Sequence, residues 1–209
     1  MAPPSIELFL ASALPWLDVA GIAVFAASGA LAAARLRKDI VTFAFFAAIT
    51  GTGGGTVRDL LIGAPVFWMH HPRPLAECLI VALLVWSTPR AWWGDRALDW
   101  FDAVGLAAYA VYGAAKARAW EIPDLPAAGM GVVTACVGGI IRDVLAGEPS
   151  SLLRPELYVT CAALSAGSYV ALASVGVSPI VAALIGASAG FVLRALAIRY
   201  DLRLPGYNR

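Results

Sequence analysis

Four long apolar runs without a single charged residue constrain this chain more than any other feature of its sequence. They cover residues 19–34, 40–57, 125–141 and 157–193. A transmembrane helix needs about 20 consecutive, mostly apolar residues, so the runs have lengths that suit a bilayer. A soluble helical bundle would need polar outer faces, which these runs lack. We therefore expect an all-α integral membrane protein.

The runs and two weaker apolar segments predict seven transmembrane helices. The last run is too long for one helix, and Gly176, Ser178 and Pro179 divide it in two. The weaker segments carry charges near their ends, where long side chains can reach water. Besides the first three runs, the predicted helices lie at about residues 75–92, 99–117, 157–175 and 179–197. We expect residues 1–17 to be an uncleaved lead-in or a short interfacial helix, because no basic residue precedes their short apolar stretch.

Composition and motifs exclude several classes of function. Apolar residues make up 60% of the chain and charged residues 14%, and the net charge of +1 comes without a basic stripe, so no nucleic-acid partner is expected. Cys78, Cys136 and Cys161 lie in or beside apolar segments without metal-ligand spacing, and His70 and His71 lack a third ligand. No catalytic or nucleotide-binding motif is present. We expect neither an enzyme, nor a cofactor, nor a metal site.

The distribution of basic residues predicts the orientation in the membrane. With seven spans, the loops after helices 1, 3 and 5 lie on the same side as the C-terminal tail. Nine basic residues fall on that side: Arg35, Arg37, Lys38, Arg90, Arg96, Arg154, Arg199, Arg203 and Arg209. The other side has three: Arg73, Lys116 and Arg118. Because basic loops stay in the cytoplasm, we expect the N-terminus outside and the C-terminus inside.

The chain repeats itself at a fixed offset of 84 residues. The matches include Asp18 with Asp102, Gly21 with Gly105, Gly29 with Gly113, Thr50 with Thr134, Gly54-Gly55 with Gly138-Gly139, Arg58-Asp59 with Arg142-Asp143, Gly63 with Gly147 and Pro65 with Pro149. Each unit holds three spans, and an odd number makes the second copy cross in the opposite direction. We expect one membrane domain, 1–209, made of repeat 1 (18–92), an inverted repeat 2 (99–175) and a seventh helix (178–199).

Glycine-rich motifs in the middle helix of each repeat carry the predicted site. Residues 50–59 read TGTGGGTVRD, and residues 138–143 read GGIIRD. Glycine costs about 1 kcal/mol relative to alanine in a helix interior, so successive glycines predict a kink or an unwound break. Bare carbonyls and threonine hydroxyls at a break can replace part of a cation's hydration shell. The alternative is that the glycines only let helices pack closely.

The inverted repeat predicts that the two motifs face each other in the middle of the membrane. The candidate pore residues are Thr50, Thr52, Gly53, Gly54, Gly55, Arg58, Asp59, Thr134, Gly138, Gly139, Arg142 and Asp143. The candidate supporting polar residues are Asp18, Asp102, Ser28 and Tyr109, with Tyr112 as a further hydroxyl. Ordinary packing is the alternative for each of the hydroxyl-bearing side chains taken alone.

Arg58 and Arg142 are predicted to line or gate a polar path. Neighbouring residues on a helix point about 100° apart, so we expect neither arginine to pair with the aspartate that follows it. We expect Asp59 and Asp143 to anchor the arginines across the repeat interface, or the counterparts Asp18 and Asp102 to do so. The alternative is that these charges, late in each span, reach the lipid headgroups.

These motifs resemble those of the trimeric intracellular cation (TRIC) channel family, in its prokaryotic branch. The resemblance extends over nearly the whole chain, from the duplicated unit with GGGTVRD at 53–59 and GGIIRD at 138–143 to LRALA at 193–197 and LP at 204–205. It implies a homotrimer in the plasma (inner) membrane of a prokaryote, surrounded by lipid, with a pore in each protomer for monovalent cations, chiefly potassium. By position, it assigns the pore kink to Gly53, Gly54, Gly55, Gly138 and Gly139, and the basic positions to Arg58 and Arg142.

The expected function is therefore a passive, potassium-permeable cation channel. The alternative is a secondary transporter of a small zwitterion such as glycine, because inverted repeats with broken helices near the midplane are a common transporter design. A membrane scaffold that transports nothing fits less well with arginine and aspartate inside predicted spans.

Overall fold

The computed structural model describes residues 14–94 and 96–205. Within these residues the regular secondary structure is helical, apart from one isolated β-bridge between Glu156 and Arg203. The elements are α2 (Leu14–Arg35), α3 (Ile40–Leu61), α4 (Phe67–His70), α5 (Arg73–Ser87), the 3-10 helix η1 (Arg90–Trp92), α6 (Ala97–Ala119), α7 (Asp124–Ala146), α8 (Val159–Ser174) and α9 (Pro179–Tyr200). Each of the seven predicted segments contains a helix, the shortest being α5 with 15 residues and α8 with 16. Most of the predicted lead-in, residues 1–17, lies outside the described residues.

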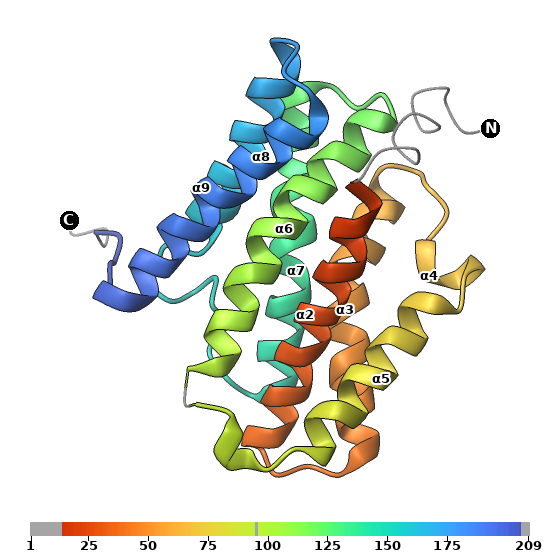
Figure 1. Ribbon diagram of the computed structural model, residues 1–209, viewed down its shortest axis with the longest axis vertical. Helices are drawn as coiled ribbons and strands as arrows, with labels where there is room; N and C mark the ends of the chain where they lie inside the picture. The colour runs from red at the N-terminus through yellow and green to blue at the C-terminus, as the bar shows by residue number, and fades with distance from the viewer. Residues whose placement is uncertain (1–13, 95, 206–209) are drawn as a thin grey trace.

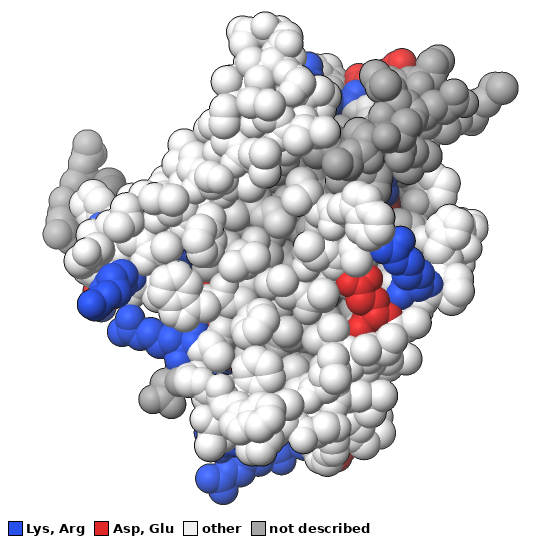
Figure 2. Space-filling view, viewed as in Figure 1, with Lys and Arg blue, Asp and Glu red and all other residues white. Residues whose placement is uncertain are grey.

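The surface of the helix bundle suits a lipid environment. Four helices are long and apolar enough to cross a bilayer: Trp16–Arg35, Ile40–Leu61, Asp124–Ala146 and Pro179–Tyr200. Large apolar side chains point outward, among them Val41, Leu84 and Leu184. Figure 2 shows a face that is mostly uncharged, with its charged side chains in a few small groups near the edges of the view. Apolar surface of this extent is costly in water, so the chain is an integral membrane protein.

The helices form two groups of three and one additional helix (Figure 1). Within the first group, α2, α3 and α5 pack against one another, and α6, α7 and α8 do the same in the second. The groups meet where α2 packs on α6 and α3 packs on α7, and α9 packs against α6 and α8. In Figure 1, α2 runs down the view and α6 runs up, while α3 runs up and α7 runs down.

Small residues allow the helices to approach closely. A Cβ atom on Gly29 would collide with the carbonyl oxygen of Phe46 on α3, and one on Gly131 with that of Ala110 on α6. In lipid, where apolar burial does not drive helices together, such close packing stabilises a bundle. The three cysteines are buried and free, which agrees with their position in or beside apolar segments of the sequence.

Candidate functional site

The centre of the molecule is the crossing of α3 and α7 at their glycines. A Cβ atom on Gly54 would collide with the carbonyl oxygen of Thr134, and one on Gly138 with that of Thr50. A Cβ atom on Gly53 would lie 3.8 Å from the Cα atom of Gly138. The two backbones therefore touch, and the prediction that the two glycine motifs face each other is confirmed.

Both helices remain continuous through their glycines, so an unwound break is wrong, and a kink of the helix axis stays a prediction. The helical hydrogen-bonding pattern covers Ile40–Leu61 and Asp124–Ala146 without interruption. The glycines are buried, and a buried backbone group that gives up its hydrogen bond loses more than the roughly 1 kcal/mol that glycine costs a helix. The glycines act here by letting the helices touch, which is the alternative that the sequence left open.

The threonines of the motifs mostly bond to their own helices. The hydroxyl of Thr52 donates to the carbonyl of Ala48 at 2.7 Å, and that of Thr134 donates to the carbonyl of Met130 at 2.6 Å. The hydroxyl of Thr50 is buried without a hydrogen-bond partner among the described residues. The hydroxyl protons of Thr52 and Thr134 are thus bonded to their own helix, and that of Thr50 is not.

Arg142 lies in a buried cluster with two aspartates. Its Nε and Nη2 atoms donate to Oδ1 of Asp143 at 2.9 and 2.7 Å, and its Nη1 atom donates to Oδ1 of Asp102 at 2.6 Å. Nη1 also donates to the hydroxyl of Ser28 on α2. Charge-assisted bonds of this kind compensate a guanidinium that is only 2% exposed. Asp102, which belongs to one of the two sets of anchors that the sequence left open, therefore bonds to this arginine.

Arg58 lies in the corresponding cluster of the first group, where two cations share one carboxylate. Its Nε atom donates to Oδ1 of Asp59 at 2.9 Å, and Nζ of Lys116 donates to the same oxygen at 2.8 Å. The guanidinium lies over the ring of Tyr112 at 5.2 Å and that of Phe67 at 6.0 Å. Its Nη1 atom has no hydrogen-bond partner in the part of the chain that the structure describes.

The two clusters follow the 84-residue offset, but their charges differ. Asp18 corresponds to Asp102, yet it attracts Arg58 and Lys116 electrostatically without making an ion pair with either one among the described residues. Lys116 corresponds to Ala32, so the second cluster has no equivalent of this cation. The first cluster is therefore the richer in positive charge.

The prediction that neither arginine pairs with the aspartate after it is wrong. Arg58 bonds to Asp59, and Arg142 bonds to Asp143. The angle of about 100° describes only where neighbouring side chains leave the helix. An arginine side chain has four rotatable bonds, so it can fold around the helix until its guanidinium reaches the neighbouring carboxylate.

A tight turn after each helix positions its aspartate. Gly63 and Gly147 have φ angles of +69° and +71°, a left-handed conformation that glycine adopts without a steric penalty. The chain then folds back over the helix end. The backbone N–H of Phe67 donates to Asp59 at 3.1 Å, and that of Ser151 donates to the second motif's aspartate at 2.9 Å. Each donor follows its acceptor by eight residues, as the repeat requires.

Sequence reasoning missed several members of these clusters: Lys116, Phe67 and Ser151. The orientation count places Lys116 among the basic residues outside the membrane. A lone lysine within an alanine-rich apolar segment, however, indicates a buried partner. Phe67 and Ser151 come from loops that only tertiary packing places. Tyr109 adjoins the first cluster, because its ring stacks on that of Tyr112 at 6.0 Å between centroids, and its hydroxyl is 3.4 Å from the carbonyl of Gly51.

A cavity of about 120 Å³ adjoins the second cluster. Its lining includes Arg142 and Asp143 together with Asp99 and Glu148. Carboxylate oxygens in such a place can bind a hydrated cation weakly, while the guanidinium groups of Arg35, Arg142 and Arg154, which also line it, repel it. Among the described residues, no group of three or more His, Cys, Asp or Glu side chains could hold a metal ion.

A family model described as "Glycine transporter" matches the chain twice, at residues 15–90 and 99–174. The matches fall on the two groups of three helices. A UPF0126 membrane protein of Vibrio cholerae is 40% identical over 202 residues, which cover 94% of this chain and 83% of that protein. The UPF0126 inner membrane protein YadS of Escherichia coli K12 is 39% identical over 199 residues, covering 92% and 95% of the two chains.

Solved structures with a similar fold are described as cation channels. The TRIC trimeric intracellular cation channel orthologue from Rhodobacter sphaeroides has a TM-score of 0.84 and 40% identity, covering 90% of this chain and 98% of its own. A structure titled for conductance through TRIC cation channels has a TM-score of 0.81 and 28% identity, with coverage of 95% and 98%. A channel from C. elegans, at 16% identity and a TM-score of 0.62, shares the fold.

Proposed function

Since this chain belongs to the prokaryotic branch of the trimeric intracellular cation (TRIC) channel family, we propose that it is a potassium-permeable channel for monovalent cations. The observation that carries the proposal is the pair of buried Arg–Asp clusters on either side of the α3–α7 crossing. Charged side chains inside a membrane protein often mark the path of an ion, and the sequence has no catalytic motif that would use them in another way. We place one pore in each protomer of a homotrimer, along α3 and α7 and their candidate residues.

We further propose that all seven long helices cross the membrane as two inverted repeats, 18–92 and 99–175, followed by α9. The double family match and the opposite directions of α2 and α6 in Figure 1 support this arrangement. Lys116 is buried in an ion pair with Asp59, so it leaves the loop count, and nine basic residues stand against the remaining two, Arg73 and Arg118. That balance supports a cytoplasmic C-terminus in a bacterial inner membrane.

The clusters suggest how such a pore would be controlled. In this conformation the α3 and α7 backbones touch, and each guanidinium occupies a carboxylate that a cation would need. Moving an arginine away from its aspartate removes a repulsive charge and frees carboxylate oxygens. Arg58 is held less completely than Arg142, because its Nη1 atom is unpartnered among the described residues. We therefore assign the first movement to Arg58.

Planar-bilayer recording of the purified full-length protein tests this function. We expect single-channel steps in KCl that disappear when N-methylglucamine replaces potassium. Arg58→Ala and Arg142→Ala should each change the open probability, whereas Arg203→Ala, which removes an exposed pair with Asp201, should not. Absence of current in the wild-type protein contradicts the channel, and unchanged current in both cluster variants contradicts the gating role.

A glycine transporter is the second candidate, because the matching family model carries that description. Proteoliposomes loaded with buffer and given labelled glycine separate the two functions. Saturable uptake that unlabelled glycine competes away, without single-channel steps, would favour the transporter. Steps in the bilayer without uptake would favour the channel.

A further inference from the structure

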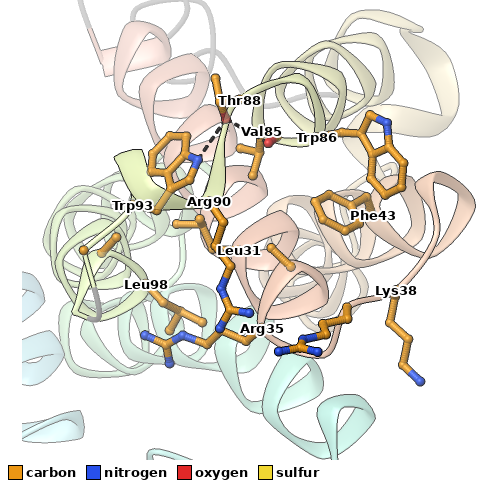
Figure 3. A pocket seen from close by; sticks show the side chains of 14 residues that line it. Leu31, Arg35, Lys38, Phe43, Val85, Trp86, Thr88, Arg90, Trp93 and Leu98 are labelled. Carbon is orange, nitrogen blue, oxygen red and sulfur yellow. Dashed lines mark hydrogen bonds between the residues drawn. The ribbon is translucent and has the colours of Figure 1, made fainter.

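A cavity of about 440 Å³ lies away from the α3–α7 crossing, at the end of the bundle where the α2–α3 loop meets the connection from α5 to α6. Figure 3 shows it from close by. Two segments far apart in the sequence form its rim, residues 35–38 and residues 86–94. Neither the pore proposal nor the repeat motifs account for this cavity.

Four basic side chains line the cavity, and among the residues that the structure describes no acidic side chain does: Arg35, Arg37, Lys38 and Arg90. Arg37, Lys38 and Arg90 take part in none of the ion pairs found among the described residues. Arg35 is also attracted to Asp99, so the other three carry the argument. Like charges around one cavity repel each other until an anion neutralises them.

The opposite side of the cavity is aromatic and held in place. The indole N–H of Trp93 donates to the hydroxyl of Thr88 at 2.8 Å, and the ring of Trp86 meets that of Phe43 edge-to-face at 4.9 Å between centroids. Figure 3 shows the two indoles on one side and the charged ends of Arg35 and Lys38 on the other. The cavity is thus amphipathic.

Exposed apolar side chains stand on the two helices beside this cavity. Val41 on α3 is 75% exposed, and Leu83 and Leu84 on α5 are about half exposed or more. Tryptophan collects at the boundary between lipid and water, and clusters of basic residues next to a span attract anionic headgroups. A soluble anion would contact only the basic side chains and would leave the adjoining apolar side chains without a partner.

We propose that this cavity binds the phosphate group of an anionic phospholipid of the phosphatidylglycerol type. Arg37, Lys38 and Arg90 neutralise the phosphate, and the acyl chains run along the exposed apolar faces of α3 and α5. The proposed lipid site does not depend on ion conduction, so a protein that conducts no ions would not contradict it.

Titration of the full-length protein in an uncharged detergent tests the site. The probes are dioctanoyl phosphatidylglycerol, dioctanoyl phosphatidylcholine and glycerol 3-phosphate, followed by tryptophan fluorescence. We expect phosphatidylglycerol to bind at least tenfold more tightly than either of the other two. Trp86→Phe and Trp93→Phe together should reduce the fluorescence change, since both indoles line the cavity. An unchanged signal in that double variant would place binding elsewhere and overturn the proposal.

Arg37→Gly is the decisive variant, because Arg37 has a φ angle of +52°, where glycine is the unstrained residue. It removes a charge without harming the fold, and Arg90→Gln removes a second charge. Each should weaken phosphatidylglycerol binding about fivefold, and both together about 25-fold, if each basic residue contributes as it does near an anionic membrane surface. Arg73→Gln, an exposed basic residue at the other end of α5, is the matched control and should change nothing.

Two results would overturn the assignment. Equal affinity for phosphatidylglycerol and phosphatidylcholine, or full affinity in Arg37→Gly, would exclude recognition of the anionic headgroup by this cavity. Glycerol 3-phosphate binding as tightly as the lipid would make the cavity a site for soluble phosphate esters instead. If Arg90→Gln does not fold, the Arg37→Gly comparison alone decides.

Discussion

Each buried charged side chain in the two clusters has an oppositely charged side chain within hydrogen-bond distance. Oδ1 of Asp59 accepts from both Arg58 and Lys116, while Asp102 and Asp143 share Arg142. Removing one member of such a set strands the others in a medium of low dielectric constant. Removing one of these buried carboxylates should therefore cost more stability than removing an exposed carboxylate.

Asp59→Asn should destabilise the protein by about 3–5 kcal/mol, because it leaves two buried cations without a carboxylate. Lys116→Met in the same background should recover part of that loss by removing one of the stranded charges. Thermal unfolding of the four proteins of this double-mutant cycle in detergent measures the coupling. Asp124→Asn, in an exposed ion pair with Arg118, is the control and should have little effect. Strictly additive effects of the two substitutions would contradict a direct pair.

Gly138→Ala should destabilise the protein by about 1–3 kcal/mol through overpacking, because its new methyl group meets the carbonyl oxygen of Thr50. Gly129→Ala, in the same helix with open space around the added atom, should be neutral or stabilising by up to about 1 kcal/mol. Melting temperatures of the two variants test the comparison. Equal melting temperatures would mean that α3 and α7 do not touch as described.

At the scale of elements, α3 and α7 are held at their ends as well as at their crossing. The carboxylate of Asp39 caps α3 by accepting from the backbone N–H of Thr42 at 2.8 Å and from its hydroxyl at 3.0 Å. At the far end of each helix, the loop that follows Gly63 or Gly147 folds back onto the aspartate of the motif. These restraints fix the axial positions of the two clusters.

The cap on α3 should respond to acid. Hydrogen bonds from the backbone N–H and then the hydroxyl of Thr42 lower the pKa of Asp39. A lowered folded-state pKa means that the ionised cap stabilises the helix above the unfolded value of about 3.9 and loses this effect as the pH falls through the folded value. Asp39→Asn should therefore melt below the wild type at pH 7, and the gap should narrow at pH 3. A gap that is the same at both pH values would contradict the charge effect.

At the scale of the whole molecule, two groups of three helices surround one central crossing, and α9 lies outside both. The offset of 84 residues holds for close contacts as well as for sequence. A Cβ atom on Gly21 would meet the ring of Tyr109, and one on Gly105 would meet the ring of Phe25. Such reciprocity is what a two-fold relation between the groups produces.

Two introduced cysteines test the proposed inversion. Lys38 and Glu121 are exposed in the loops that follow the first helix of each group. Lys38→Cys should react with a membrane-impermeant maleimide only from the cytoplasmic side, and Glu121→Cys only from the outside. The native cysteines are buried, so the wild-type protein should stay unlabelled. Labelling of both variants from one side would mean that the two groups cross the membrane in the same direction.

Some features of this protein follow from its sequence alone. The charge-free runs required a membrane because their length and apolarity leave no other solvent. The offset of 84 residues was enough to bring the glycine motifs face to face, because duplicated units tend to pack symmetrically. It also offered Asp18 and Asp102 as one of two possible sets of anchors for the arginines. These are properties of composition and repetition, which do not depend on the details of packing.

Only the tertiary structure decided the rest. It kept α3 and α7 continuous, folded Arg58 back onto Asp59 and brought Lys116 to the same carboxylate. It also gathered Arg37 and Arg90, which are distant in sequence, around one cavity. The physical reason is that side-chain partners depend on which helices touch and at what depth, and the spacing of residues along one helix does not contain that information.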